Sequence, residues 1–219
     1  MLEFARALAA AALLGLAAAA PAAAEGAAGT RGRKFYISAY ASQWVESDLA
    51  EIPHRLPTWS LETRRAYFLG GGLGHVLVPR FEVPLPFCGG CALRGNSLDL
   101  EGVVLKHFDL QDHWEVAGGA FARTGQIPLF RGAELNLAAG AGLSYALSDP
   151  KLENGRGGQR GADTYRLQFY LAFETELAHG AVPGWTLVGR IHHRSGGYGT
   201  LTEQGSGSNF IGLGLRRSL

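Results

Sequence analysis

From Thr164 onward, apolar and polar residues alternate along the chain with a period of two. One face of this segment carries Tyr165, Leu167, Phe169, Leu171, Phe173 and Leu177, and the other carries Arg166, Gln168, Glu174 and Glu176. Successive side chains of a β-strand point to opposite faces, so this period predicts a strand with one apolar face. The same alternation recurs from Glu134 and from Gly184. The sequence therefore predicts an all-β fold.

The alternating runs number eight and are separated by turn-rich segments. They lie at roughly 34–45, 65–78, 98–107, 113–123, 134–147, 164–178, 185–195 and 208–218. Runs of about 10 to 15 residues suit tilted membrane strands, whereas soluble strands average about five or six residues. We expect an eight-stranded antiparallel transmembrane β-barrel of the outer membrane.

The second face of each strand carries charges, which a closed lumen would enclose. Eight strands make the smallest common barrel, whose interior is filled by side chains. An enclosed charge needs a partner, so we expect ion pairing in the lumen. The residues concerned are Arg190, Arg216, Glu174 and Glu101. Glycines within the strands, such as Gly70–Gly72 and Gly140, suit positions that meet crowded lumen side chains.

An even number of strands places both termini on the periplasmic side. The connections at about 46–64, 148–163 and 194–207 would then be extracellular. The connection at about 79–97 would be a periplasmic insertion, and we expect a disulfide across its turn between Cys88 and Cys91. Tryptophan rings favour the head-group region of a membrane, so we expect the four tryptophans in interface girdles. They are Trp44, Trp59, Trp114 and Trp185.

The N-terminus has the features of a signal peptide for export. One positive side chain precedes an apolar run, and small residues before Glu25 offer a cleavage site. We expect a signal peptide over 1–24 and a single barrel domain over 25–219, located in the cell outer membrane. The formal net charge of +1 gives no indication of a nucleic-acid partner.

One cluster near the end of the seventh predicted strand suggests chemistry. His193 and Ser195 are two residues apart, so in a strand they share a face. By parity this face continues that of Trp185, Leu187 and Ile191, which is the lipid side. A histidine that takes the proton of a serine is the core of nucleophilic ester hydrolysis. The pair would meet lipid at the extracellular end of the barrel.

The segment His193-Arg194-Ser195-Gly196-Gly197, followed by Gly207-Ser208-Asn209-Phe210, resembles the C-terminal region of the PagL-type lipid A 3-O-deacylases. That family consists of eight-stranded outer-membrane barrels that remove the 3-linked acyl chain from lipid A. The resemblance implies that lipid A, within lipopolysaccharide of the outer leaflet, is the partner. It also implies that His193 is the general base and that Ser195 is the nucleophile.

Two positions depart from the family motif of His-x-Ser-Asn with a later Glu. The Asn position holds Gly196, so the backbone amides of Gly196 and Gly197 are the expected oxyanion donors. The Glu position falls on Gly207 or Ser208, and Glu203 in the same loop is the candidate for the third catalytic residue, with Asn209 as the alternative. We expect no cofactor and no metal.

Three other interpretations remain open from the sequence. The departures from the motif are the reason to consider a non-catalytic small barrel with a structural or adhesive role in the envelope. A soluble periplasmic barrel that binds lipid is a weaker interpretation. The cluster formed by His107, Asp109, Asp112 and His113 could bind a metal, but a solvated hairpin tip is the favoured interpretation.

Overall fold

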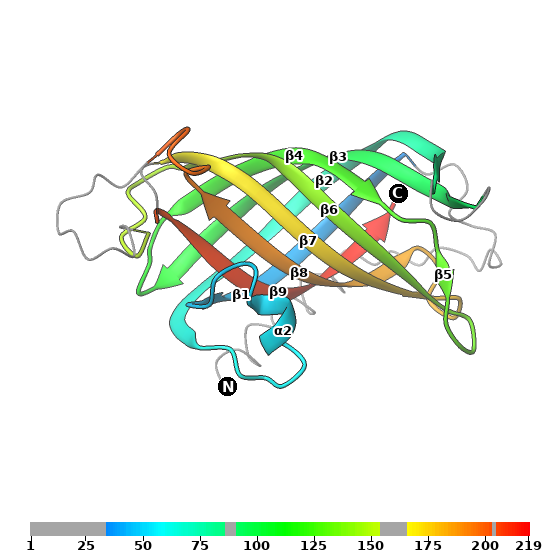
Figure 1. Cartoon of the computed structure of the whole chain (residues 1–219), viewed down its shortest axis with the longest axis horizontal. Coiled ribbons are helices and arrows are strands. Elements are labelled where there is room, and N and C mark those ends of the chain that lie inside the picture. Colours follow the sequence, from blue (N-terminus) through cyan, green and yellow to red (C-terminus); the bar gives the residue numbers. More distant parts are fainter. Residues whose placement is uncertain (1–33, 86–90, 154–165, 203–204) are drawn as a thin grey trace.

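The computed structural model of the chain describes residues 34–85, 91–153, 166–202 and 205–219. Within these residues, one antiparallel sheet of nine strands closes on itself into a barrel (Figure 1). The predicted signal peptide, Cys88 and Glu203 lie outside the described residues. Cys91 directly precedes a strand and is disulfide-bonded.

Eight long strands form the barrel wall. The strands of the sheet are β1 (Phe35–Val45), β2 (Thr63–Pro84), β3 (Ala92–Asp109), β4 (Trp114–Arg123), β5 (Ile127–Pro128), β6 (Ala133–Ala146), β7 (Leu167–His179), β8 (Trp185–Ser195) and β9 (Gly207–Ser218). β1 pairs with β9, and β4 pairs with β6, so the ring is closed. The two-residue β5 pairs with β6 alone. The prediction of an eight-stranded antiparallel barrel is confirmed.

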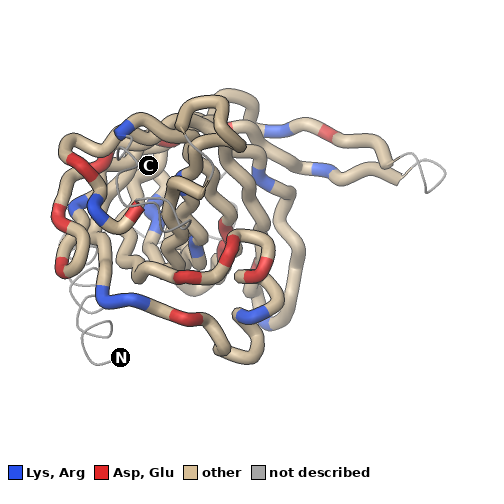
Figure 2. Tube along the Cα trace, turned by 60° about the vertical axis from the view of Figure 1, so that its left-hand side comes forward, with Lys and Arg blue, Asp and Glu red and all other residues tan. Residues whose placement is uncertain are grey.

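The connection predicted at 79–97 is largely a paired extension of two strands. β2 and β3 continue past the barrel, with Val78 opposite Leu98 and Val83 opposite Leu93. Figure 2 shows this extension standing out sideways from the barrel wall. The sequence predicted an insertion here but not this pairing, because register shifts interrupt the alternation of β2. A second unpredicted element is the short helix α2 (Ile52–Arg55) between β1 and β2.

Both described termini lie at one end of the barrel, which we call the terminal end. Leu219 donates its amide to the carbonyl of Phe35 at 2.9 Å. We call the opposite end the distal end. The connections at the distal end join β1 to β2, β3 to β4, β6 to β7 and β8 to β9 (Figure 1).

Glycines in the wall make room for large rings in the lumen. A Cβ at Gly74 would overlap the ring of Tyr36, and one at Gly140 would overlap the ring of Phe121. Both rings are buried. A small barrel must fill its interior with side chains, so a ring from one strand needs a glycine on its neighbour. The expectation that Gly140 meets a crowded lumen side chain is confirmed.

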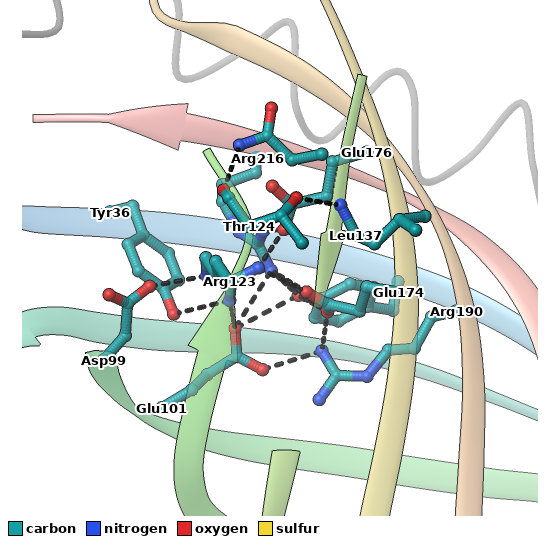
Figure 3. A network of polar contacts seen from close by, with 12 residues as sticks. Tyr36, Asp99, Glu101, Arg123, Thr124, Leu137, Glu174, Glu176, Arg190 and Arg216 are labelled. Carbon is teal, nitrogen blue, oxygen red and sulfur yellow. Dashed lines mark hydrogen bonds and ion pairs between the residues drawn. The ribbon is translucent and has the colours of Figure 1, made fainter. Parts of the chain in front are cut away.

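The four charges predicted to meet in the lumen form one network (Figure 3). The Arg190 guanidinium lies 2.7 Å from a carboxylate oxygen of Glu101 and 3.0 Å from one of Glu174. The Arg216 guanidinium lies 3.2 Å from Glu101 and 3.0 Å from Glu174. All four residues are buried, so each charge is compensated inside the wall.

The network is larger than the sequence indicated. Arg123 joins it from β4 and forms ion pairs with Asp99, Glu174 and Glu176. Its guanidinium also donates to the Tyr36 hydroxyl at 3.0 Å. Figure 3 shows carboxylates and guanidinium groups from β3, β4, β7 and β8 converging on the barrel axis. These contacts tie strands on opposite sides of the wall together.

Apolar side chains cover the outside of all eight long strands. They include Ile37, Leu73, Leu100, Val104, Val116, Leu137, Leu143, Phe173, Leu177, Leu187 and Leu213, each exposed to the surroundings. An apolar exterior around a charged, filled lumen is the arrangement of a transmembrane barrel. No helix among the described residues is long and apolar enough to cross a membrane.

The tryptophans divide between the two sides of the wall. Trp114 begins β4 near the distal end, and Trp185 begins β8 near the terminal end, as two girdles require. Trp44 is buried in the lumen, with its ring 5.4 Å from that of Phe210, so its assignment to a girdle was wrong. Parity explains this placement, because Trp44 shares the inward face of β1 with Tyr40.

The lumen network yields a test on two adjacent arginines. Arg216→Met leaves Glu174 and Glu176 without one of their counterions, and we expect a loss of about 3 to 5 kcal/mol of stability. Arg217→Met is the control, because Arg217 points outward and donates to the carbonyl of Pro183. The measurement is urea unfolding of the barrel in lipid vesicles, followed by electrophoretic mobility. Equal stability of the two variants would contradict a stabilising role for the network.

Candidate functional site

The distal end of β8 carries side chains on both sides of the wall. His192 and Arg194 are buried in the lumen, whereas His193 and Ser195 are half-buried on the outside. The predicted shared outward face of His193 and Ser195 is therefore confirmed. Because β8 is paired on both sides, its neighbours fix the position of this pair.

Asn209 of β9 lies directly opposite His193 and bonds its ring. The distance from His193 Nδ1 to Asn209 Oδ1 is 2.6 Å. The other end of the amide is also held, because Asn209 Nδ2 donates to the carbonyl of Ser47 at 2.9 Å. This second bond orients the amide so that its oxygen faces the imidazole. The arrangement requires the proton of a neutral His193 on Nδ1 and leaves Nε2 as the proton acceptor.

The segment 46–62 covers the outer wall beside this pair. Asn209 points outward, yet only 4% of its surface is exposed. Val45 and Ile52 are likewise buried outside the lumen, and Figure 1 shows α2 alongside the wall near β1 and β9. The bond from Asn209 to Ser47 is therefore shielded on the outside, which strengthens it relative to a bond in water.

Gly196 and Gly197 form a tight turn directly after Ser195. The carbonyl of Gly196 accepts from the amide of Leu201 at 3.0 Å, and that of Gly197 accepts from the amide of Thr200 at 3.1 Å. Gly197 has a φ of 63°, a region that favours glycine. A Cβ at Gly196 would overlap Thr202, and one at Gly197 would overlap the ring of Phe169. Only glycine fits both positions of this turn.

Apolar side chains border the pair on the side of β7. Phe169 lies opposite Ser195, and Leu171 lies opposite His193. Further along the same outward face, Phe173 lies opposite Ile191. These residues form a continuous apolar strip from the middle of the wall to Ser195. A hydrocarbon chain that follows the strip would end at the serine hydroxyl.

Under the pair, on the lumen side, an ion pair fixes the distal loops to the wall. Arg194 lies 2.7 Å from both carboxylate oxygens of Glu153, which belongs to the connection between β6 and β7. Ser208 of β9 donates to the same carboxylate at 2.9 Å. This contact could not be predicted from local alternation, because Glu153 and Arg194 are 41 residues apart.

The structure brings together most of the residues predicted for the site. His193 and Ser195 lie together on the outer wall, with Gly196 and Gly197 in the adjoining turn. Of the two candidates for the third residue, Asn209 contacts His193, and Glu203 lies outside the described residues.

The hairpin between β3 and β4 differs from the expectation of a solvated tip. His107 and His113 are buried, because both rings point into the distal mouth of the barrel. The two aspartates are exposed as expected, and Asp109 pairs with Arg65 and Asp112 with Lys106 on the surface. Burial of a polar hairpin depends on lumen space, which the alternation of the two strands does not reveal.

The fold is similar to that of two solved structures. One is the crystal structure of the outer membrane enzyme PagL, with a TM-score of 0.54 and 11% sequence identity over 84% of this chain and 99% of that chain. The other is the crystal structure of Neisserial surface protein A (NspA), with a TM-score of 0.47 and 14% identity over 84% of this chain and 97% of that chain. Comparisons with protein families and with curated proteins find no match. The likeness to PagL concerns the fold.

The bond between His193 and Asn209 predicts the tautomer of the imidazole. Nitrogen NMR of histidine-labelled protein in detergent should show His193 protonated on Nδ1. Asn209→Leu removes the acceptor, so this signal should shift toward a mixture of tautomers. His193→Gln identifies the signal by its loss. A wild-type spectrum with the proton on Nε2, or no change in Asn209→Leu, would contradict the geometry.

Proposed function

We propose that this protein is an outer-membrane esterase that removes an ester-linked acyl chain, at the 3-O position, from lipid A. The observation that carries the proposal is the outward placement of His193 and Ser195, with Asn209 orienting the imidazole. A base and a nucleophile that face lipid are of use to an enzyme whose substrate is a lipid.

In the proposed reaction, Ser195 Oγ attacks the ester carbonyl while His193 Nε2 takes its proton. The C–O bond to the sugar then breaks, and His193 returns the proton to the departing sugar hydroxyl. Water, deprotonated by the same nitrogen, attacks the acyl-serine ester, the bond to Ser195 Oγ breaks and releases the fatty acid, and His193 returns the proton to Ser195 Oγ. The backbone amides of Gly196 and Gly197 are the candidates for stabilising the oxyanion at both steps.

Asn209 would replace the acidic residue of the family motif. An amide beside a catalytic histidine can impose the wrong tautomer if its NH2 group faces the ring. Here the bond from Asn209 Nδ2 to Ser47 leaves Oδ1 for His193, so the productive tautomer is retained. An amide carries no charge, so it stabilises the protonated imidazole less than a carboxylate does.

The position of the pair on the wall supports lipopolysaccharide as the substrate. With periplasmic termini, the distal end faces the cell exterior, where the outer leaflet consists of lipopolysaccharide. The apolar strip formed by Phe169, Leu171 and Phe173 would hold the acyl chain beside the barrel. The ester of a 3-linked chain lies between its hydrocarbon and the sugar, at the depth expected for Ser195 near the end of β8.

Mass spectrometry of lipid A from expressing cells tests the reaction. The wild type should remove one hydroxyacyl mass, and Ser195→Ala should leave lipid A intact. His193→Gln should lower the rate by about 100- to 10,000-fold, the contribution of general acid–base catalysis. The control is Ser60→Ala, an exposed serine in the segment 46–62 that bonds Thr58 and should keep full activity.

Each variant must be shown to be folded, by its resistance to unfolding in cold detergent. If the folded wild type leaves lipid A unchanged in cells where a known deacylase acts, the proposal fails. The non-catalytic envelope barrel then becomes the better account. Equal activity of wild type and Ser195→Ala would mean that another residue is the nucleophile.

A further inference from the structure

A second cluster of polar side chains lies inside the distal mouth of the barrel, on the other side of the wall from Ser195. It consists of His107 from β3, His113 from the β3–β4 hairpin and Glu115 from β4, all of them buried. One potential ligand atom from each residue lies within 4.8 Å of the others. The cluster plays no part in the proposed ester hydrolysis.

The carboxylate of Glu115 is held in place by three neighbours. Its Oε2 lies 2.9 Å from His107 Nε2, and its Oε1 lies 2.9 Å from His192 Nε2. Ser144 also donates to Oε1, at 2.7 Å. A carboxylate positioned by such partners is a preorganised anionic ligand.

His113 is buried without a hydrogen bond to either ring nitrogen among the described residues. Its ring stacks on that of His107, with centroids 4.1 Å apart and planes 9° apart. Nδ1 of His107 is also buried and unpartnered. Buried polar atoms without partners are costly, and a ligand that binds them would remove this cost.

The charge of the cluster favours a cation. Besides the imidazoles of His107, His113 and His192, the buried ionisable groups here include the carboxylates of Glu115 and Glu153 and the guanidinium of Arg194. Arg194 is 2.7 Å from both oxygens of Glu153 but 3.9 Å from the nearest oxygen of Glu115. Arg194 is thus closer to Glu153 than to Glu115, and a bound cation would balance the carboxylate of Glu115.

We infer that His107, His113 and Glu115 form a binding site for a divalent transition-metal ion of the zinc type. Two imidazoles and one carboxylate are a donor set that zinc accepts, whereas calcium and magnesium require more oxygen ligands. Neither ring nitrogen of His113 has a hydrogen bond among the described residues, so either can serve as a zinc ligand. The ion would anchor the β3–β4 hairpin in the barrel mouth.

The test uses untagged barrel folded in detergent and stripped with a chelator. After addition of zinc and removal of the unbound ion, elemental analysis should find one zinc per barrel in the wild type. His113→Ala should bind zinc at least about 100-fold more weakly, a larger effect than most changes beyond the ligand shell. Calcium and magnesium should not compete.

The matched control is His75→Ala, which removes a histidine that stacks on Phe35 near the terminal end. It should bind zinc as the wild type does. Cobalt provides a second readout, since its absorption distinguishes four ligands from six, and only barrels with His113 should give the four-coordinate spectrum. Absence of stoichiometric zinc from the folded wild type, or equal affinity of the wild type and His113→Ala, would overturn the inference.

Discussion

Closure of the sheet through the pairing of β4 with β6 is the constraint on which the rest of this structure depends. A membrane offers no water to backbone amides and carbonyls, so an open edge inside it is excluded. Once the ring is closed, strand alternation leaves only two environments for a side chain, the lipid and the lumen. Every ionic contact of the interior, and the outward direction of the candidate catalytic pair, follow from this division.

β8 carries side chains in both environments, the lumen and the outside of the wall. Arg190 and His192 point inward and bond to carboxylates from other strands, and Arg194 points inward and bonds to Glu153 of the connection between β6 and β7. His193 and Ser195 alternate with them and point outward. The inward contacts fix the backbone of β8 at each second residue, so the outward pair is held on a rigid element.

The lumen contains two polar layers with different chemistry. Toward the terminal end, guanidinium groups and carboxylates neutralise one another around Arg216 and Glu174. Toward the distal end, imidazoles take the place of guanidinium groups around Glu115. In the first layer three guanidinium groups and four carboxylates form ion pairs with one another. In the second, neither ring nitrogen of His113 has a hydrogen bond among the described residues, which is why it has the properties of a ligand site.

The sequence by itself determined the number of long strands, the inward direction of Glu101 and Arg190 and the outward direction of Ser195, because strand parity is local. It did not determine that β2 and β3 would stay paired past Val78 as far as Pro84 and Ala92, since their register shifts there hide the alternation. Only the tertiary structure decided that Asn209 meets His193 and that His113 is buried. Those contacts depend on which strands become neighbours and how much lumen remains, and both are set by closure of the whole ring.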